Sequence, residues 1–148
     1  MRKSEKMVCF ANCPIVWKGR LQDTIALSTM EAECMALSSA MKELIPFQEL
    51  LRGVAGSIGL EASKTTFRTN VHEDNEGALT SAKLEPGRHT PRSKHCAIKC
   101  HWFRSFLRPN KAEIKSIDTK EQRADIMAEG LPFNQFKVIR RLLSGWLM

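Results

Sequence analysis

The sequence predicts an α/β fold, on the evidence of three successive patterns of apolar residues. Val8 and Phe10 alternate with other residues as in a half-buried strand, and Ile15 and Trp17 repeat the alternation after a turn. A long stretch with helical spacing follows, and a shorter strand pattern and helix pattern come after it. Strand patterns that alternate with helix patterns predict a sheet flanked by helices.

The first predicted elements are a β-hairpin and a long helix. The hairpin turn is expected at 12–14, and its second strand begins at Ile15 and resumes at 25–27. The helix is expected from about Thr29 to Arg52, with a kink at Pro46, which lacks a backbone donor, and an end at the glycines that follow. Its apolar stripe has helical spacing. The stripe consists of Met30, Cys34, Leu37, Met41 and Leu44.

The next predicted elements place one acidic residue at the end of a strand. Residues 66–72 read as extended, and Asp74 and Asn75 then cap a short helix that runs to Leu84. Asp74 therefore falls at the carboxyl end of a strand, the edge where ligands gather in open α/β sheets.

The carboxyl-terminal third of the chain predicts a basic helix, a strand and two further helices. Ile98, Trp102 and Phe106 stripe the basic helix, and the last strand covers 113–117. Thr119 and Gln122 match a capping box, which puts Asp125 on a helix that ends near residue 130. An amphipathic helix is expected over 132–148.

Two carboxylates begin the long helix, and only one of them has a structural explanation. Ser28 and Glu31 match the S-x-x-E capping box, in which each side chain binds a backbone N–H at the helix start. Glu33 lies one turn further, beside the apolar stripe. A solvated surface position is the ordinary role for such a residue, and a metal ligand is the alternative.

The charge of the chain is concentrated in one segment. The formal net charge is +7. The segment from Lys83 to Lys111 contains eight basic residues and a single acidic residue, Glu85. A basic segment of this kind binds phosphate backbones without regard to sequence, through release of counterions. A basic face that only contacts solvent remains the alternative.

The cysteines and the length of the apolar runs indicate in which cellular compartment the protein is expected. Five cysteines without disulfide-framework spacing predict free thiols in a reducing compartment. No apolar run approaches the roughly 18 residues of a membrane span, and no signal peptide follows Met1. We expect one intracellular domain over 1–148, with no membrane partner.

Several ordered segments together carry a family resemblance. They include ALSTMEAE at 26–33, EDNEGAL at 73–79, SKHCAIK at 93–99 and EQRADIM at 121–127. In this order they resemble the ribonuclease H domain of copia-type (Pseudoviridae-like) LTR retrotransposon polyproteins, over about 2–131. The resemblance implies a ribonuclease H-like mixed sheet flanked by helices, and cleavage of the RNA strand of RNA–DNA hybrids during reverse transcription.

The resemblance also implies a set of site residues. Glu33, Asp74 and Asp125 take the second, third and fourth places of a four-carboxylate site that holds two Mg²⁺ ions, with Mn²⁺ as a substitute. Carboxylate oxygens suit these hard cations. Two bound metal ions together activate a water and stabilise the leaving oxygen. The residues expected to contact nucleic acid are Ser28, Thr29, Asn75, Arg88, Arg92, Lys94, His95 and Lys99.

The sequence departs from the family pattern at its start. In the family an Asp-bearing strand, central in the sheet, precedes the Arg-Lys-Ser found here at 2–4. We therefore expect an amino-terminally truncated domain that lacks this first strand, and an isolated chain with negligible activity. Unpaired strand edges would result, and such edges capture other strands.

Other expectations follow from the resemblance, and two rival readings stay open. The expected partners are the hybrid and the reverse transcriptase portion of the same polyprotein, in cytoplasmic virus-like particles and the nucleus. One rival is a catalytically inactive remnant or co-opted nucleic-acid-binding module. The other is a zinc-dependent module, whose candidate ligands crowd into seven residues without a second ligand pair. They are His95, Cys96, Cys100 and His101.

Overall fold

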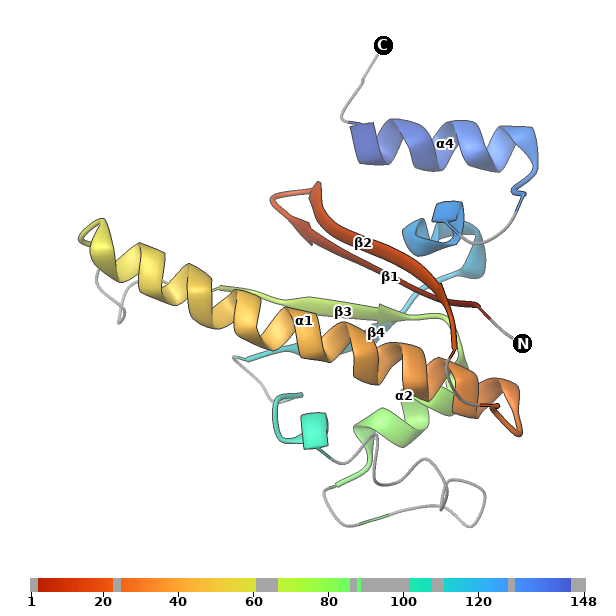
Figure 1. Ribbon diagram of the computed structural model, residues 1–148, viewed down its shortest axis with the longest axis horizontal. Helices are drawn as coiled ribbons and strands as arrows, with labels where there is room; N and C mark the ends of the chain where they lie inside the picture. The colour runs from red at the N-terminus through yellow and green to blue at the C-terminus, as the bar shows by residue number, and fades with distance from the viewer. Residues whose placement is uncertain are drawn as a thin grey trace.

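The computed structural model describes residues 3–22, 25–60, 67–85, 88, 102–107, 111–127 and 130–144. Its elements confirm the α/β class: strands and helices alternate along the chain (Figure 1). The described strands form two separate two-stranded sheets, β1–β2 and β3–β4, rather than one mixed sheet.

The first sheet is the predicted hairpin with a different turn. Strand β1 (Lys3–Phe10) pairs antiparallel with β2 (Cys13–Leu21), and Phe10 faces Cys13. The turn is therefore Ala11–Asn12, both with positive φ, of 50° and 64°, as a two-residue hairpin turn with matching twist requires. Residues 25–27 do not resume the strand, and Ile25 and Leu27 are exposed.

The long helix α1 (Thr29–Ser57) carries most of the core. Its predicted apolar stripe is confirmed, since Cys34, Leu37 and Met41 are buried. The helix includes Pro46 and continues five residues past its predicted end, through two glycines. Its carboxyl-terminal end extends past the strands (Figure 1).

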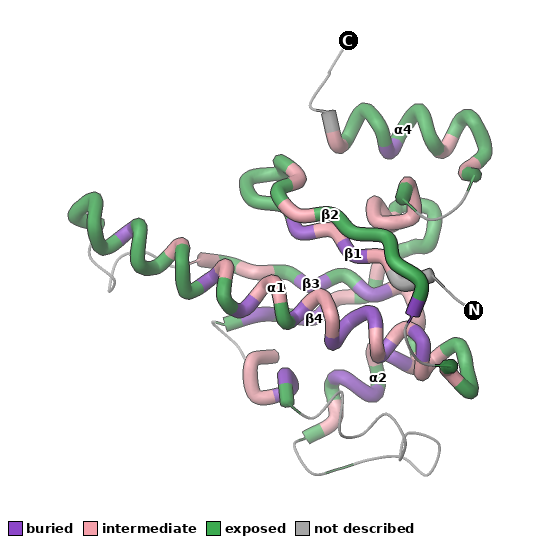
Figure 2. Tube along the Cα trace, in the orientation of Figure 1, coloured by how far each residue is buried: buried purple, intermediate pink, exposed green. Residues whose placement is uncertain are grey.

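The second sheet is short and parallel. Strand β3 (Asn70–Glu73) pairs with β4 (Glu113–Ser116), and Val71 lies opposite Ile114. Helix α2 (Glu76–Lys83) follows β3 directly. One apolar core joins this sheet to α1, α2 and the segment 102–107 (Figure 2). Its buried members are Cys34, Leu37, Met41, Ile45, Val71, Ala78, Ala82, Phe103, Ala112 and Ile114.

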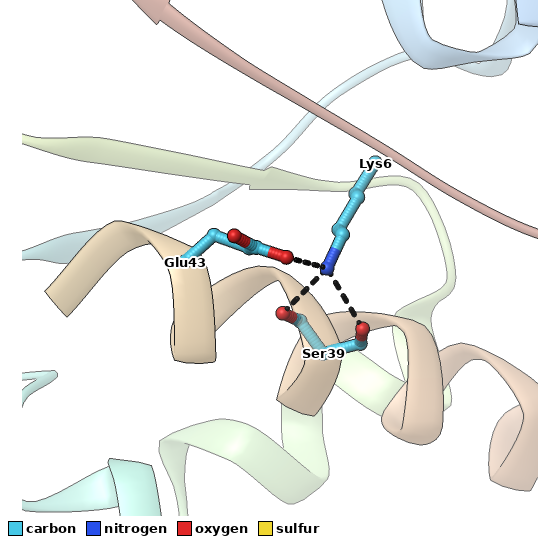
Figure 3. A network of polar contacts seen from close by, with 3 residues as sticks. All are labelled: Lys6, Ser39 and Glu43. Atoms are coloured by element: carbon cyan, nitrogen blue, oxygen red, sulfur yellow. Dashed lines mark hydrogen bonds and ion pairs between the residues drawn. The ribbon is translucent and has the colours of Figure 1, made fainter. Parts of the chain in front are cut away.

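Lys6 of the hairpin makes polar contacts to α1. Lys6 Nζ donates hydrogen bonds to Ser39 O at 3.0 Å, Ser39 Oγ at 2.9 Å and Glu43 Oε1 at 2.8 Å (Figure 3). The hydrogen bond and the charge of Lys6 hold the pKa of Glu43 below its ordinary value. Val8 adds a buried apolar contact, and Phe10 meets Phe47 edge to face.

The carboxyl-terminal elements cover the hairpin. Two short 3₁₀ helices, η2 (Thr119–Glu121) and η3 (Arg123–Met127), precede α4 (Phe133–Ser144). Helix η3 contacts β1 and β2, and α4 contacts η3 and β2. The amphipathic helix predicted at 132–148 is thus observed as α4, whereas the helix predicted around Asp125 is a single 3₁₀ segment. Within the described residues, no helix has the length and apolar character needed to cross a membrane.

Candidate functional site

The start of α1 is built as the capping box predicts. Ser28 is the N-cap, and its hydroxyl accepts a hydrogen bond from Glu31 N at 3.1 Å. The Glu31 carboxylate reaches back to Leu27 N at 2.8 Å, one residue before the expected partner. Glu31 is therefore occupied with the backbone, and Glu33 follows it as a half-buried residue between buried Ala32 and Cys34.

The end of β3 places Asp74 next to the start of α2. Asn75 is the N-cap of α2, and its side-chain oxygen accepts from Ala78 N at 3.0 Å. Asp74 is half-buried and is not the capping residue. Of the two residues predicted to cap this helix, Asn75 does so and Asp74 does not. Asn75 was also expected to contact nucleic acid.

Glu73 is an acidic residue that sequence reasoning missed. It is 6% exposed and lies on the buried face of β3, two residues after Val71. Burial raises the pKa of Glu73 from 4.5 to about 7, against a hydrogen bond from Asn75 N that lowers the pKa. The negative charges of Glu33 and Asp74 raise this pKa further, so the three carboxylates interact. The alternation of side chains along a strand, counted from the apolar Val71, could have predicted that Glu73 is buried.

A close approach of two helices brings these carboxylates together. A Cβ atom on Gly77, in the first turn of α2, would meet Met30 Cγ at 3.1 Å and Asn75 Oδ1 at 3.2 Å. Because glycine leaves this space, the first turn of α1 packs against the first turn of α2. This contact places Glu33 and Asp74 near enough to Glu73 for their charges to raise its pKa.

Asp125 is carried by a different part of the fold. It lies half-buried in η3, which contacts the hairpin, and Met127 O lies 3.3 Å from the Cβ position of Gly19 on β2. The predicted capping box at Thr119 is wrong, because Asp118 is the N-cap of η2 and accepts from Lys120 N at 2.8 Å. Across the described residues, no three His, Cys, Asp or Glu side chains form a group able to hold a metal ion.

The structure describes only part of the predicted nucleic-acid surface. Ser28 and Thr29 are exposed at the start of α1. Arg88 is exposed and pairs with Glu85 at 3.3 Å. Arg104, counted in the basic segment, is buried, and its guanidinium donates to Ser81 Oγ and to the Arg88 carbonyl. The remaining candidates for nucleic acid or zinc lie outside the described residues, namely Arg92, Lys94, His95, Cys96, Lys99, Cys100 and His101.

Comparison with known proteins gives a likeness to a transposon polyprotein. The chain is 28% identical, over 135 residues, to the "Retrovirus-related Pol polyprotein from transposon TNT 1-94" of Nicotiana tabacum. The match covers 91% of this chain and 9% of that polyprotein. No protein-family model matches the chain, and no solved structure matches it. The likeness supports a retrotransposon-derived protein.

Proposed function

We propose that the chain is a ribonuclease H-type domain of a retrotransposon polyprotein, which cleaves the RNA strand of RNA–DNA hybrids. One observation carries the proposal: the first turns of α1 and α2 pack together at Met30 and Gly77, so that Glu33 and Asp74 lie near the buried Glu73 and raise its pKa. The likeness to a transposon polyprotein supports the same assignment.

The carboxylates of Glu33 and Asp74 are of a type that binds magnesium. The described residues do not place a third metal ligand beside these two. Oxygen donors such as Glu33 and Asp74 suit Mg²⁺, and a bound pair of ions would supply an activated water and stabilise the leaving oxygen. Asp125 is the proposed third ligand, on an element that contacts the hairpin. Glu33 and Asp74 supply negative charge near Glu73, which a bound cation would neutralise.

An additional strand between the two sheets is the second part of the proposal. Within the described residues β1 pairs only with β2, and β3 only with β4. The arrows of β1 and β3 point in opposite directions (Figure 1). A strand that runs with β3 therefore runs against β1, and would join both pairs into one mixed sheet. Such a strand, bearing an Asp, would end on the same side as Asp74.

The proposed partners follow from this activity. The RNA–DNA hybrid would lie against Arg88 and the basic residues after it, which would contact phosphates. Recognition would rest on duplex shape and 2′-hydroxyls. The reverse transcriptase portion of the same polyprotein is the second proposed partner, in virus-like particles of the cytoplasm and in the nucleus.

A second candidate function is a nucleic-acid-binding module without catalysis. The observation that favours it is that the described residues contain no group of three or more metal ligands. In this reading the chain is an inactive remnant or a co-opted module, and its basic residues act alone.

The deciding experiment adds a strand to the chain. We expect the chain of 148 residues to leave a labelled RNA–DNA hybrid intact in Mg²⁺, and the same chain with an Asp-bearing strand fused at its amino terminus to cleave the RNA strand. The matched control carries Asn in place of that Asp. Hybrid binding without cleavage in both fusions would favour the binding module.

A further inference from the structure

Helix α4 carries a concentration of positive charge that the proposed site does not use. Its twelve residues include Lys137, Arg140 and Arg141 and no acidic residue. All three basic residues are exposed, and most of α4 is coloured as exposed in Figure 2. Such a helix attracts polyanions, and the attraction weakens as salt rises.

The packing of α4 fixes the direction of these charges. Ile139 is fully buried, and Gln135, four residues before it, donates from Nε2 to Lys120 O at 3.4 Å. At 3.6 residues per turn, the three basic residues lie about 100° to 160° around the helix from Ile139. They therefore point away from the side that packs on the protein.

Aromatic residues accompany the charges. The Arg140 guanidinium lies over the Phe136 ring, 5.8 Å from its centroid, a cation–π geometry that restricts its direction. Phe133 is 75% exposed, and the helical repeat places it between Lys137 and Arg140. An exposed ring among cations suits a base or sugar beside a phosphate chain.

We propose that this basic face of α4, formed by Phe133, Lys137, Arg140 and Arg141, binds the phosphate backbone of nucleic acid at a surface separate from the Glu33–Asp74 site. In Figure 1, α4 lies on the far side of the β1–β2 hairpin from α1 and α2. The inference goes beyond the proposed function, because it needs no carboxylate and no cleavage.

Anionic lipid is the competing polyanion, and the packing of α4 disfavours it. A helix that lies in a membrane surface inserts a wide apolar face. Here the apolar side of α4 is turned toward the protein at Ile139. The exposed apolar residues of α4 are divided by the buried Ile139, with Phe133 and Phe136 on one side of it and Val138 and Leu142 on the other, so they form no single wide face.

The test compares two double variants with equal charge. Lys137→Gln with Arg141→Gln removes two charges from α4, and Lys42→Gln with Arg52→Gln removes two from exposed positions of α1. Binding of a labelled RNA–DNA hybrid is followed by fluorescence anisotropy across salt concentrations in EDTA, so cleavage plays no part. We expect the slope of log affinity against log salt to flatten by about 1.4 to 1.8 in the α4 variant only, at 0.7 to 0.9 per contact.

Three outcomes would overturn the inference. Equal slopes in the two double variants would mean that α4 contributes only net charge. If the α4 variant lost binding to phosphatidylserine vesicles while its salt slope for the hybrid stayed unchanged, the basic face would bind lipid instead. A flattened slope in the charge-preserving variant, Lys137→Arg with Arg141→Lys, would attribute the effect to altered packing. A failure of the Asp-bearing fusion to cleave the hybrid would overturn the proposed function and leave this result standing.

Discussion

The β3–β4 sheet and the β1–β2 hairpin both contact α1, through different kinds of side chain. Val71 and Ile114 of the β3–β4 sheet join a continuous apolar core with α1 and α2. The hairpin meets α1 through the bonds of Lys6 to Ser39 and Glu43 (Figure 3) and through the ring contact of Phe10 with Phe47. Its outer apolar residues, including Trp17 and Leu21, stay exposed (Figure 2).

The difference bears directly on the candidate site. Glu33 and Asp74 belong to the half with the apolar core, and they interact with Glu73 there. Asp125 lies on η3, which contacts the hairpin. In the proposed site, bringing Asp125 to Glu33 and Asp74 would therefore depend on how the two halves are joined, and a strand between β1 and β3 would join them through backbone hydrogen bonds.

The same substitution in the two sheets should give the largest contrast. Ile114 on β4 is 7% exposed and Ile15 on β2 is 36% exposed. We expect Ile114→Ala to lower the free energy of unfolding by about 2–5 kcal/mol, because it leaves a cavity in the core. Ile15→Ala should cost at most about 1 kcal/mol. Urea denaturation of both variants measures this, and similar losses would mean that the hairpin is packed as tightly as the core.

The buried carboxylate of the well-packed half should make stability depend on pH. Below pH 4.5 Glu73 is protonated in both states. Between pH 4.5 and about 7 the unfolded chain releases its proton while the folded chain keeps it. Stability should therefore fall by about 3 kcal/mol as pH rises through this window, and change no further above it.

The matched variant for this effect is Glu73→Gln, which cannot titrate and keeps an acceptor for Asn75 N. The two proteins should differ in stability at pH 8 and converge near pH 4, as thermal or urea unfolding at each pH would show. A difference that does not change with pH would mean that Glu73 is solvated in the folded protein.

The polar attachment of the hairpin should respond to a smaller, local change. Lys6→Met keeps an unbranched side chain, one atom shorter, and removes the three hydrogen bonds to α1, at an expected cost of about 1–3 kcal/mol. Amide hydrogen exchange should speed up in β1 and β2 and stay unchanged in β3 and β4. Faster exchange in both sheets alike would show that the two halves open together.

Local features of the fold could be predicted from the sequence because they depend on near neighbours. The capping of α1 by Ser28 and the stripe through Met41 follow from spacing along one helix. The end of α1 was missed because Gly53 and Gly56 weaken a helix by only about 1 kcal/mol each. The turn at Ala11 was missed because alanine seldom adopts positive φ.

Features that depend on distant contacts could not be predicted in this way. Glutamate is usually exposed, so the burial of Glu73 became visible only where β3 packs into the core. Asp118 caps η2 in place of Thr119, because two adjacent polar residues compete for one backbone position. The resemblance named Glu33 and Asp74 together, whereas the approach of α1 to α2 depends on Gly77 and Met30, which no local pattern marks.

The most direct test of the proposed site compares two glutamates two residues apart on α1. In the chain completed by an Asp-bearing strand, we expect Glu33→Gln to abolish Mg²⁺-dependent cleavage of the hybrid. Glu31→Gln should keep turnover and cost only stability, because glutamine can still bind Leu27 N. Abolished cleavage in Glu31→Gln together with retained cleavage in Glu33→Gln would contradict the assignment.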